Sequence, residues 1–151
     1  MKQAMFLAVR PYDEMVAWAL KYESAGFDSL WQAELTNSAL IQLATLAPGL
    51  GSIKIGSGVP LAFNHNPVML AFLAMHLDFP SQDKFILGLE VAHQNRNKNW
   101  YAGRDEGKPV SQMREYIEVL GQYFALIDDD LTTAYCIGAR ATMFSICARI
   151  I

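Results

Sequence analysis

The sequence predicts an α/β fold built on a parallel sheet, and two observations carry this prediction. Short apolar runs of strand length alternate with longer segments of helical spacing, four times in succession. The apolar runs are nearly continuous, as strands covered on their faces in a parallel sheet must be. Strict alternation with short connections implies right-handed crossovers between parallel strands.

Each predicted strand is an apolar run that stops at a polar residue or a turn. The first stops at Arg10 and Pro11, and the second stops at Glu34. The third leads into a loop that reaches Asn66, and the fourth is almost entirely apolar. The predicted strands are residues 4–9, 29–33, 53–59 and 85–91.

Helices are predicted after these strands because apolar side chains recur at i, i+3, i+4 and i+7. Asp13 and Glu14 lie in the first turn of the first helix, where carboxylates complement the helix dipole, and Gly26 can end it. Pro67 suits the first turn of the third helix. That helix is expected to bury Leu70, Leu73, Ala74 and Leu77. The apolar stripes span residues 12–20, 40–47, 70–77 and 110–124.

Two parallel architectures compete, a doubly wound nucleotide-binding sheet and a (β/α)8 TIM-type barrel. The first requires a glycine-rich turn; Gly56 and Gly58 begin one, but Leu61 replaces its third glycine and Pro60 interrupts it. A barrel instead gathers its chemistry at the carboxyl ends of the strands. Polar residues are concentrated at those ends, at Arg10, Glu34, residues 58–66 and residues 90–93. The sequence therefore favours the barrel.

The length indicates part of such a barrel. A full barrel takes about 250 residues, or roughly 31 per strand–helix unit, so residues 1–127 hold about four units. From Asp128 the character changes: three aspartates, expected to form a solvated turn, lead into a segment with no recognisable strand–helix pair. We predict a truncated barrel half over residues 1–127 and an unmatched tail, helical or disordered, over residues 128–151. A reading frame shifted after residue 127 would also produce this pattern.

Composition excludes several classes of partner. The formal charge is −3, with no basic stripe, which argues against nucleic acid. Cys136 and Cys147 form no CxxC pair, which fits a reducing cytoplasm. The first apolar run is too short for a signal peptide, and no membrane partner is expected. The 3 histidines lack metal-ligand spacing, so no metal site is predicted; His76 is interpreted as a packing or surface residue.

Four segments resemble a known family in the same order and spacing. Residues 26–34, GFDSLWQAE, resemble the second-strand signature of the bacterial luciferase-like monooxygenases, including their deazaflavin (coenzyme F-420)-dependent branch. Residues 55–59, IGSGV, resemble the third strand, and residues 77–89 resemble the segment that enters the fourth. KPV at residues 108–110 and MREYIEVL at residues 113–120 are similar to the next helix. The resemblance runs through about residue 126.

The resemblance implies a flavin- or deazaflavin-dependent oxidoreductase or monooxygenase on a (β/α)8 barrel, using FMN or coenzyme F-420 and a small organic substrate. In this family the ring lies at the mouth of the barrel, and a non-prolyl cis peptide at the end of the third strand supports one ring face. The matching bond here joins Gly58 and Val59. An ordinary glycine-rich strand end is the alternative.

Candidate site residues follow from the strand ends and the resemblance. Glu34 is predicted to contact the substrate or the polar edge of the ring, or else to face water. His65 and Asn66 are expected to bind the ring or a phosphate near a helix N-terminus, or to be solvated. Glu90 replaces a glycine that the family usually has, and would redirect the pocket or block the flavin. His93 is a general acid or proton relay by residue type. The candidates are therefore His93 and Glu34 for catalysis, and Gly58, Val59, His65, Asn66 and Glu90 for the cofactor.

A second functional class stays open. A half-barrel leaves unpaired parallel edges, which self-association would cover, so a homo-oligomer is expected. Glu90 also fits a non-catalytic half-barrel that binds flavin or only associates with itself. The sequence thus predicts a cytoplasmic oxidoreductase, with this module as the alternative.

Overall fold

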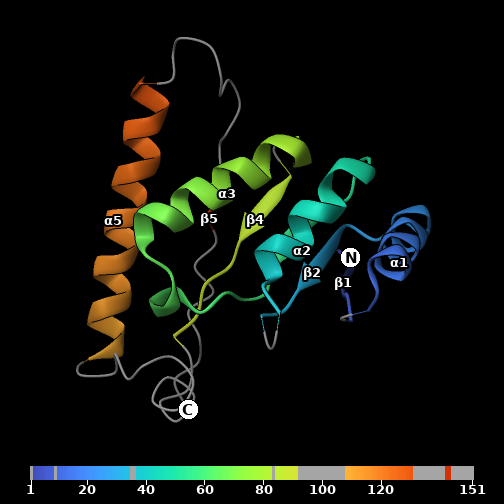
Figure 1. Ribbon diagram of the computed structural model, residues 1–151, viewed down its shortest axis with the longest axis horizontal. Helices are drawn as coiled ribbons and strands as arrows, with labels where there is room; N and C mark the ends of the chain where they lie inside the picture. The colour runs from blue at the N-terminus through green and yellow to red at the C-terminus, as the bar shows by residue number, and fades with distance from the viewer. Residues whose placement is uncertain are drawn as a thin grey trace.

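The computed structural model describes residues 2–8, 10–34, 37–82, 84–91, 108–130 and 142–143, with backbone alone for 127–130 and 142–143. All its strands are parallel, and they stand side by side in the order of the sequence (Figure 1). They are β1 (Ala4–Phe6), β2 (Ser29–Gln32), β3 (Lys54–Ser57), β4 (Phe85–Leu87) and β5 (Thr142–Met143). A doubly wound sheet reverses its strand order at a switch point, whereas a barrel does not. The predicted barrel-type α/β fold is therefore confirmed.

The helices follow the strands in the expected alternation and cross the molecule in chain order in Figure 1. None of the described helices is long and apolar enough to cross a membrane. The α-helices are α1 (Tyr12–Ser24), α2 (Ala39–Leu46), α3 (Pro67–Ser81) and α5 (Pro109–Asp130), and two 3-10 turns are η1 (Ala47–Gly49) and η2 (Ala62–Asn64).

Helix ends form where the side chains supply hydrogen bonds or a permissive backbone. Gly26 follows α1 with φ of 83°, which confirms its predicted role in ending that helix. Ser38 caps α2 by accepting from the Ile41 N–H. Asn66 caps α3 through Oδ1, which accepts from the N–H groups of Val68 and Met69 at 2.9 and 3.4 Å.

Among the residues that the structure describes, the core consists of two apolar clusters between the sheet and the helices. The smaller cluster joins β1 and β2 to α1, and its buried members are Leu7, Met15, Ala19, Leu30, Leu46 and Ile53. The larger cluster lies between β3, β4, α2, α3 and α5, with Phe85, Leu87, Leu70 and Leu120 among its fully buried side chains. This cluster fixes the strand ends that carry the site.

The C-terminal part differs from its prediction at the residues that are described. Helix α5 continues to Asp130, beyond the expected boundary at residue 127 and through the aspartates expected to form a turn. Thr142 and Met143 pair in parallel with Ile86 and Leu87 of β4, so the tail that was predicted to be helical or disordered contains a short strand. A strand this short has no alternation for a sequence pattern to detect.

Glu23, near the end of α1, ties down the loop that enters β3. Its carboxylate accepts from the backbone N–H groups of Gly51, Ser52 and Ile53 at 3.1, 2.6 and 2.9 Å. The Lys84 ammonium donates to the Gly51 carbonyl beside it. Burial raises the pKa of Glu23, but the N–H groups of Ile53, Gly51 and Ser52 and the Lys84 charge together lower it below its ordinary value.

This lowered pKa predicts a pH-dependent contribution to stability. The contribution is complete above the ordinary glutamate pKa of about 4.3 and is lost as pH falls through the lower pKa of the folded state. We expect Glu23→Gln to cost on the order of 1 kcal/mol near neutral pH, after solvent screening, and almost nothing in strong acid. Urea unfolding of both proteins across this pH range measures the difference. Glu14→Gln, at the exposed ion pair with Arg10, is the control; an equal loss at every pH for Glu23→Gln would contradict the prediction.

Candidate functional site

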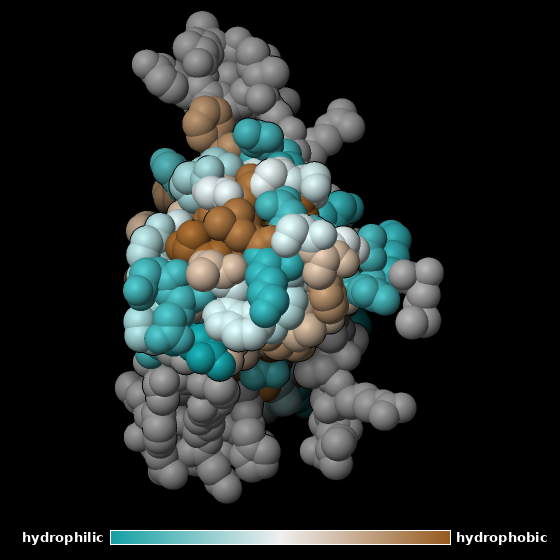
Figure 2. Space-filling model, turned by 90° about the vertical axis from the view of Figure 1, so that its right-hand side faces the viewer, coloured by the Kyte–Doolittle hydropathy of each residue, from teal (hydrophilic) through white to brown (hydrophobic). Residues whose placement is uncertain are grey.

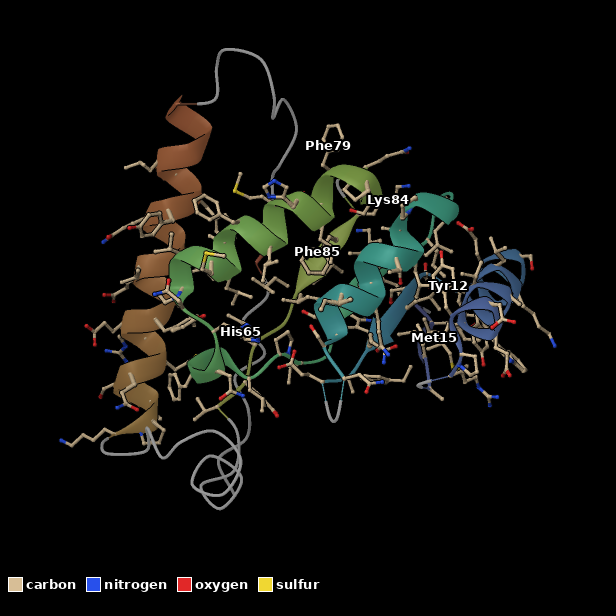
Figure 3. The ribbon with its side chains drawn as sticks, in the orientation of Figure 1. Tyr12, Met15, His65, Phe79, Lys84 and Phe85 are labelled. Carbon is tan, nitrogen blue, oxygen red and sulfur yellow. The ribbon has the colours of Figure 1, made fainter. Side chains whose placement is uncertain are left out.

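The polar residues at the carboxyl ends of β2, β3 and β4 meet at one edge of the sheet. Figure 3 places His65 between the sheet and α5, in the connection from β3 to α3. Glu34 follows β2 by two residues, and Glu90 lies just beyond β4. This edge therefore joins residues from three strands, as the barrel rule predicts.

The peptide bond between Gly58 and Val59 is cis, directly after β3. The Gly58 N–H donates to the Gln32 carbonyl at 2.8 Å, which ties the bond to β2. On the other side, Ser57 Oγ accepts from the Gly88 N–H at 3.0 Å and donates to the Gly88 carbonyl at 3.2 Å. The cis bond expected from the family resemblance is present, between two strands that hold its neighbours.

Glycines allow the backbones of β3 and β4 to approach each other closely next to the cis peptide. A Cβ on Gly88 would lie 2.4 Å from the Ser57 carbonyl oxygen and 3.0 Å from Val59 Cγ1. A Cβ on Gly58 would lie 3.2 Å from the rings of Phe6 and Trp31. A side chain at Gly88 or Gly58 would therefore meet neighbouring atoms, and the backbone of β3 and β4 packs closely at these positions.

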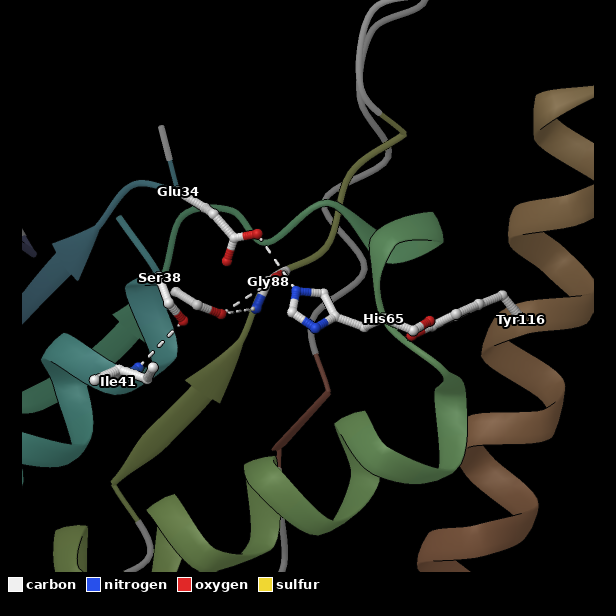
Figure 4. Close-up of polar contacts among 7 residues, drawn as sticks. Glu34, Ser38, Ile41, His65, Gly88 and Tyr116 are labelled. Carbon is white, nitrogen blue, oxygen red and sulfur yellow. Dashed lines mark hydrogen bonds and ion pairs between the residues drawn. The ribbon is translucent and has the colours of Figure 1, made fainter. Parts of the chain in front are cut away.

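Glu34 and His65 form a half-buried pair across this edge (Figure 4). The His65 Nε2 atom lies 3.3 Å from Glu34 Oε1, and their side chains are 22% and 11% exposed. Glu34 Oε2 is buried and has no hydrogen-bond partner among the described residues. The Glu34 carboxylate therefore contacts His65 through Oε1 alone.

Tyr116 of α5 holds the backbone of His65. Its hydroxyl donates to the His65 carbonyl at 3.1 Å, and its ring meets Phe63 edge-on with centroids 6.3 Å apart. Burial raises the pKa of Tyr116, so the phenol keeps its proton and remains a donor at neutral pH. We did not predict Tyr116; its sequence signal is its place on the apolar stripe of α5, three residues from Met113 and four from Leu120.

Beyond the Glu34–His65 pair, the predicted polar residues that the structure describes make contacts of their own. Asn66 uses its side-chain oxygen to cap α3, and its amide nitrogen has no hydrogen bond to the residues that the structure describes. The Glu90 backbone bridges the chain after β3, with its N–H donating to the Pro60 carbonyl at 3.0 Å and its carbonyl accepting from Ala62 at 2.9 Å. His93 lies outside the described residues. Arg10 pairs with Glu14 and lies over the ring of Trp18.

A separate cavity lies between β1 and α1. Phe6, Leu7, Arg10, Met15 and Trp18 are among its lining residues. Seen from this end of the molecule, apolar side chains gather in a patch surrounded by hydrophilic ones (Figure 2).

Within the described part of the chain, no group of three or more His, Cys, Asp and Glu side chains could hold a metal ion.

A protein-family model described as luciferase-like monooxygenase matches residues 2–129. The chain belongs to this family. It is 34% identical over 113 residues to a Mycobacterium tuberculosis protein whose name describes a putative coenzyme F-420-dependent oxidoreductase. The aligned region covers 74% of this chain and 31% of that protein. It is 32% identical over 84 residues to the alkanal monooxygenase beta chain of Photorhabdus luminescens, covering 56% of this chain and 23% of that protein. The chain thus spans about a third, or less, of the length of these luciferase-like relatives.

Solved structures share the fold at low sequence identity. The oxygenating constituent of a Pseudomonas putida diketocamphane monooxygenase, in complex with FMN, has a TM-score of 0.67 at 16% identity, covering 80% of this chain and 38% of that one. A coenzyme F-420-dependent tetrahydromethanopterin reductase from Methanopyrus kandleri has a TM-score of 0.64 at 23% identity, covering 82% and 39%. Luciferase-like barrels therefore contain the arrangement of strands and helices described above.

Proposed function

We propose that this chain binds a flavin or deazaflavin, FMN or coenzyme F-420, at the carboxyl ends of β2, β3 and β4. The observation that carries the proposal is the half-buried Glu34–His65 pair at the carboxyl ends of the strands, with one Glu34 oxygen buried and without a hydrogen-bond partner among the described residues. The pair supplies polar groups that can meet the polar edge of a planar ring. The bound cofactor would bring hydride transfer or oxygen activation on a small organic substrate.

The residues of this chain have distinct parts in the proposal. Gly58 and Val59 support the ring, and His65 meets a polar group of the ligand. Asn66 contributes its amide nitrogen, next to the N-terminus of α3, where an anionic group is favoured. Glu90 adds bulk and charge beyond β4, where the bound ring would approach the backbone. Glu34, acting through the His65 ring, and His93, by its residue type, provide the proton-handling groups.

Family membership supports the cofactor class. One relative is named for coenzyme F-420, and one solved neighbour is in complex with FMN. Because this chain covers about a third of the curated relatives it matches, the reaction of a whole family member is part of the proposal.

Titration of the purified chain with FMN and with coenzyme F-420, followed by ligand fluorescence, tests this function. We expect saturable binding of at least one of them, and we expect His65→Ala to weaken it about tenfold, the worth of one hydrogen bond to a charged or polarised group. His76→Ala is the matched control, because His76 is exposed on α3 and its Nδ1 contacts the Phe72 carbonyl of its own helix. No fluorescence change with either ligand would refute the proposal.

A second candidate, a non-catalytic module that associates with itself, is favoured by one surface. Neither α2 nor α3 carries an exposed Lys, Arg, Asp or Glu, because their one such residue, Asp78, is buried. Phe79 projects away from the body of the molecule (Figure 3). We call this surface the α2–α3 face; its exposed apolar side chains are Ile41, Met69, Phe72, Leu73 and Phe79, at 41–72% exposure. His76 is the exposed histidine on α3, and the apolar side chains around it form a patch that a second copy of the chain could cover.

We expect the chain to form a homo-oligomer through the α2–α3 face. Light scattering coupled to size exclusion should give at least a dimer mass, and Phe72→Glu should shift the mass towards the monomer because it buries a charge in that contact. Leu126→Glu, at a comparably exposed position on α5, is the control and should change nothing. A wild-type chain that stays monomeric at high concentration would contradict this prediction.

A further inference from the structure

The two ring nitrogens of His65 have different surroundings. Nε2 faces Glu34 Oε1 at 3.3 Å, and no hydrogen bond joins Nδ1 to a described residue. Figure 4 shows the ring between Glu34 and the Tyr116 contact, with its second nitrogen turned away from Glu34. An ionised carboxylate can only accept hydrogen bonds, so a neutral His65 ring bonded to it must carry its proton on Nε2.

The backbone around His65 is held on both sides. Its N–H donates to the Ala62 carbonyl at 3.1 Å, and its carbonyl accepts from the Tyr116 hydroxyl at 3.1 Å. Helix α3 begins two residues later at Pro67, after its Asn66 cap. With the backbone and one ring nitrogen fixed, the direction of the Nδ1 lone pair is fixed as well.

We propose that Glu34 is a positioning residue that holds His65 in its Nε2–H tautomer, so that His65 Nδ1 accepts a hydrogen bond from an N–H or O–H group of the bound ligand. The ligand part rests on the proposed function, whereas the tautomer does not. Because Glu34 Oε2 is buried, Glu34 acts on the ligand through the His65 ring. The site thus selects ligands that present a hydrogen-bond donor at this point.

His76 provides an internal comparison. Its Nδ1 lies 2.8 Å from the Phe72 carbonyl oxygen, which can only accept, so its proton is on Nδ1. The structure therefore assigns opposite tautomers to His65 and His76 within one chain.

Nitrogen-15 NMR of the full chain at alkaline pH, where free imidazole is neutral, tests this assignment. Long-range proton–nitrogen correlations separate the two tautomers, and His76→Gln and His93→Gln variants identify the His65 signals. We expect Nε2–H for His65 and Nδ1–H for His76. A proton on Nδ1 of His65, or the mixture found in a free imidazole, would overturn the proposal.

Two substitutions separate positioning from a merely structural role. Glu34→Leu should turn His65 into a mixture of tautomers and leave the His76 signals unchanged. Tyr116→Phe keeps the ring contact with Phe63 and should keep the His65 tautomer, since it changes only the backbone contact. If Glu34→Leu does not fold, the wild-type spectrum still decides the tautomer.

FMN is the probe for the ligand part. Added to the labelled wild-type chain, it should shift the His65 Nδ1 resonance and not the His76 resonances. FMN that binds without moving this resonance would overturn the acceptor role. If neither FMN nor coenzyme F-420 binds while the tautomers are as assigned, the proposed function and the acceptor role both fail, and the positioning of His65 by Glu34 stands.

Discussion

Gly88→Ala should destabilise the protein strongly and disrupt the edge of the sheet that carries the site. The new Cβ would lie 2.4 Å from the backbone oxygen of Ser57, so it cannot be accommodated by turning a side chain. Strands β3 and β4 would have to separate, which would stretch both hydrogen bonds between the Ser57 hydroxyl and Gly88. We expect a loss of about 3 kcal/mol, the upper end for overpacking, measured by urea unfolding.

Gly121→Ala is the matched control for that substitution. Gly121 lies inside α5, and a Cβ there meets nothing within 4 Å. Alanine in a helix interior is favoured over glycine by roughly 0.5–1 kcal/mol, so this variant should be slightly more stable than the wild type. If Gly88→Ala unfolded at the same urea concentration as the wild type and as Gly121→Ala, the predicted clash between the new Cβ and the Ser57 backbone would be contradicted.

The alternation of strands and helices could be predicted because each element has its own local pattern. Gly26 and Pro67 mark helix boundaries through backbone preferences that act within a few residues. Leu73 shows the limit of this reasoning: its spacing predicts burial, but the side chain is 42% exposed. Helix α3 is apolar around most of its circumference, so periodicity does not identify which face meets the sheet. That choice depends on the tertiary position of the helix.

The site could be predicted in its location and less well in its contacts. Strand ends indicate Glu34 and His65 separately, since each follows a strand in the sequence. Their pairing joins residues 31 apart, and the Tyr116 contact joins residues 51 apart, so both depend on the path of the loop after β3. The cis peptide became an expectation through family resemblance, because no local pattern of spacing or composition specifies it.

Asp78→Ala should have the other large effect on stability, at the opposite end of the sheet. Asp78 is completely buried near the end of α3, and its Oδ1 accepts from the Phe85 N–H at 3.1 Å and from the Ser81 hydroxyl at 3.3 Å. The contact to Phe85 fastens α3 to the first residue of β4. Alanine leaves that buried N–H without its acceptor and opens a small cavity, so we expect a loss of about 2–4 kcal/mol in urea unfolding.

Ser81→Ala separates the carboxylate contact from the turn around it. This variant removes the hydroxyl that donates to the Asp78 carbonyl and Oδ1 and accepts from the Lys84 N–H, but it preserves the bond from the Phe85 N–H to Asp78 Oδ1. The Lys84 N–H is only half-buried, and water can replace part of its bond, so the expected cost is about 1 kcal/mol. Equal losses for Ser81→Ala and Asp78→Ala would mean that the hydroxyl network, rather than the carboxylate, fastens α3 to β4.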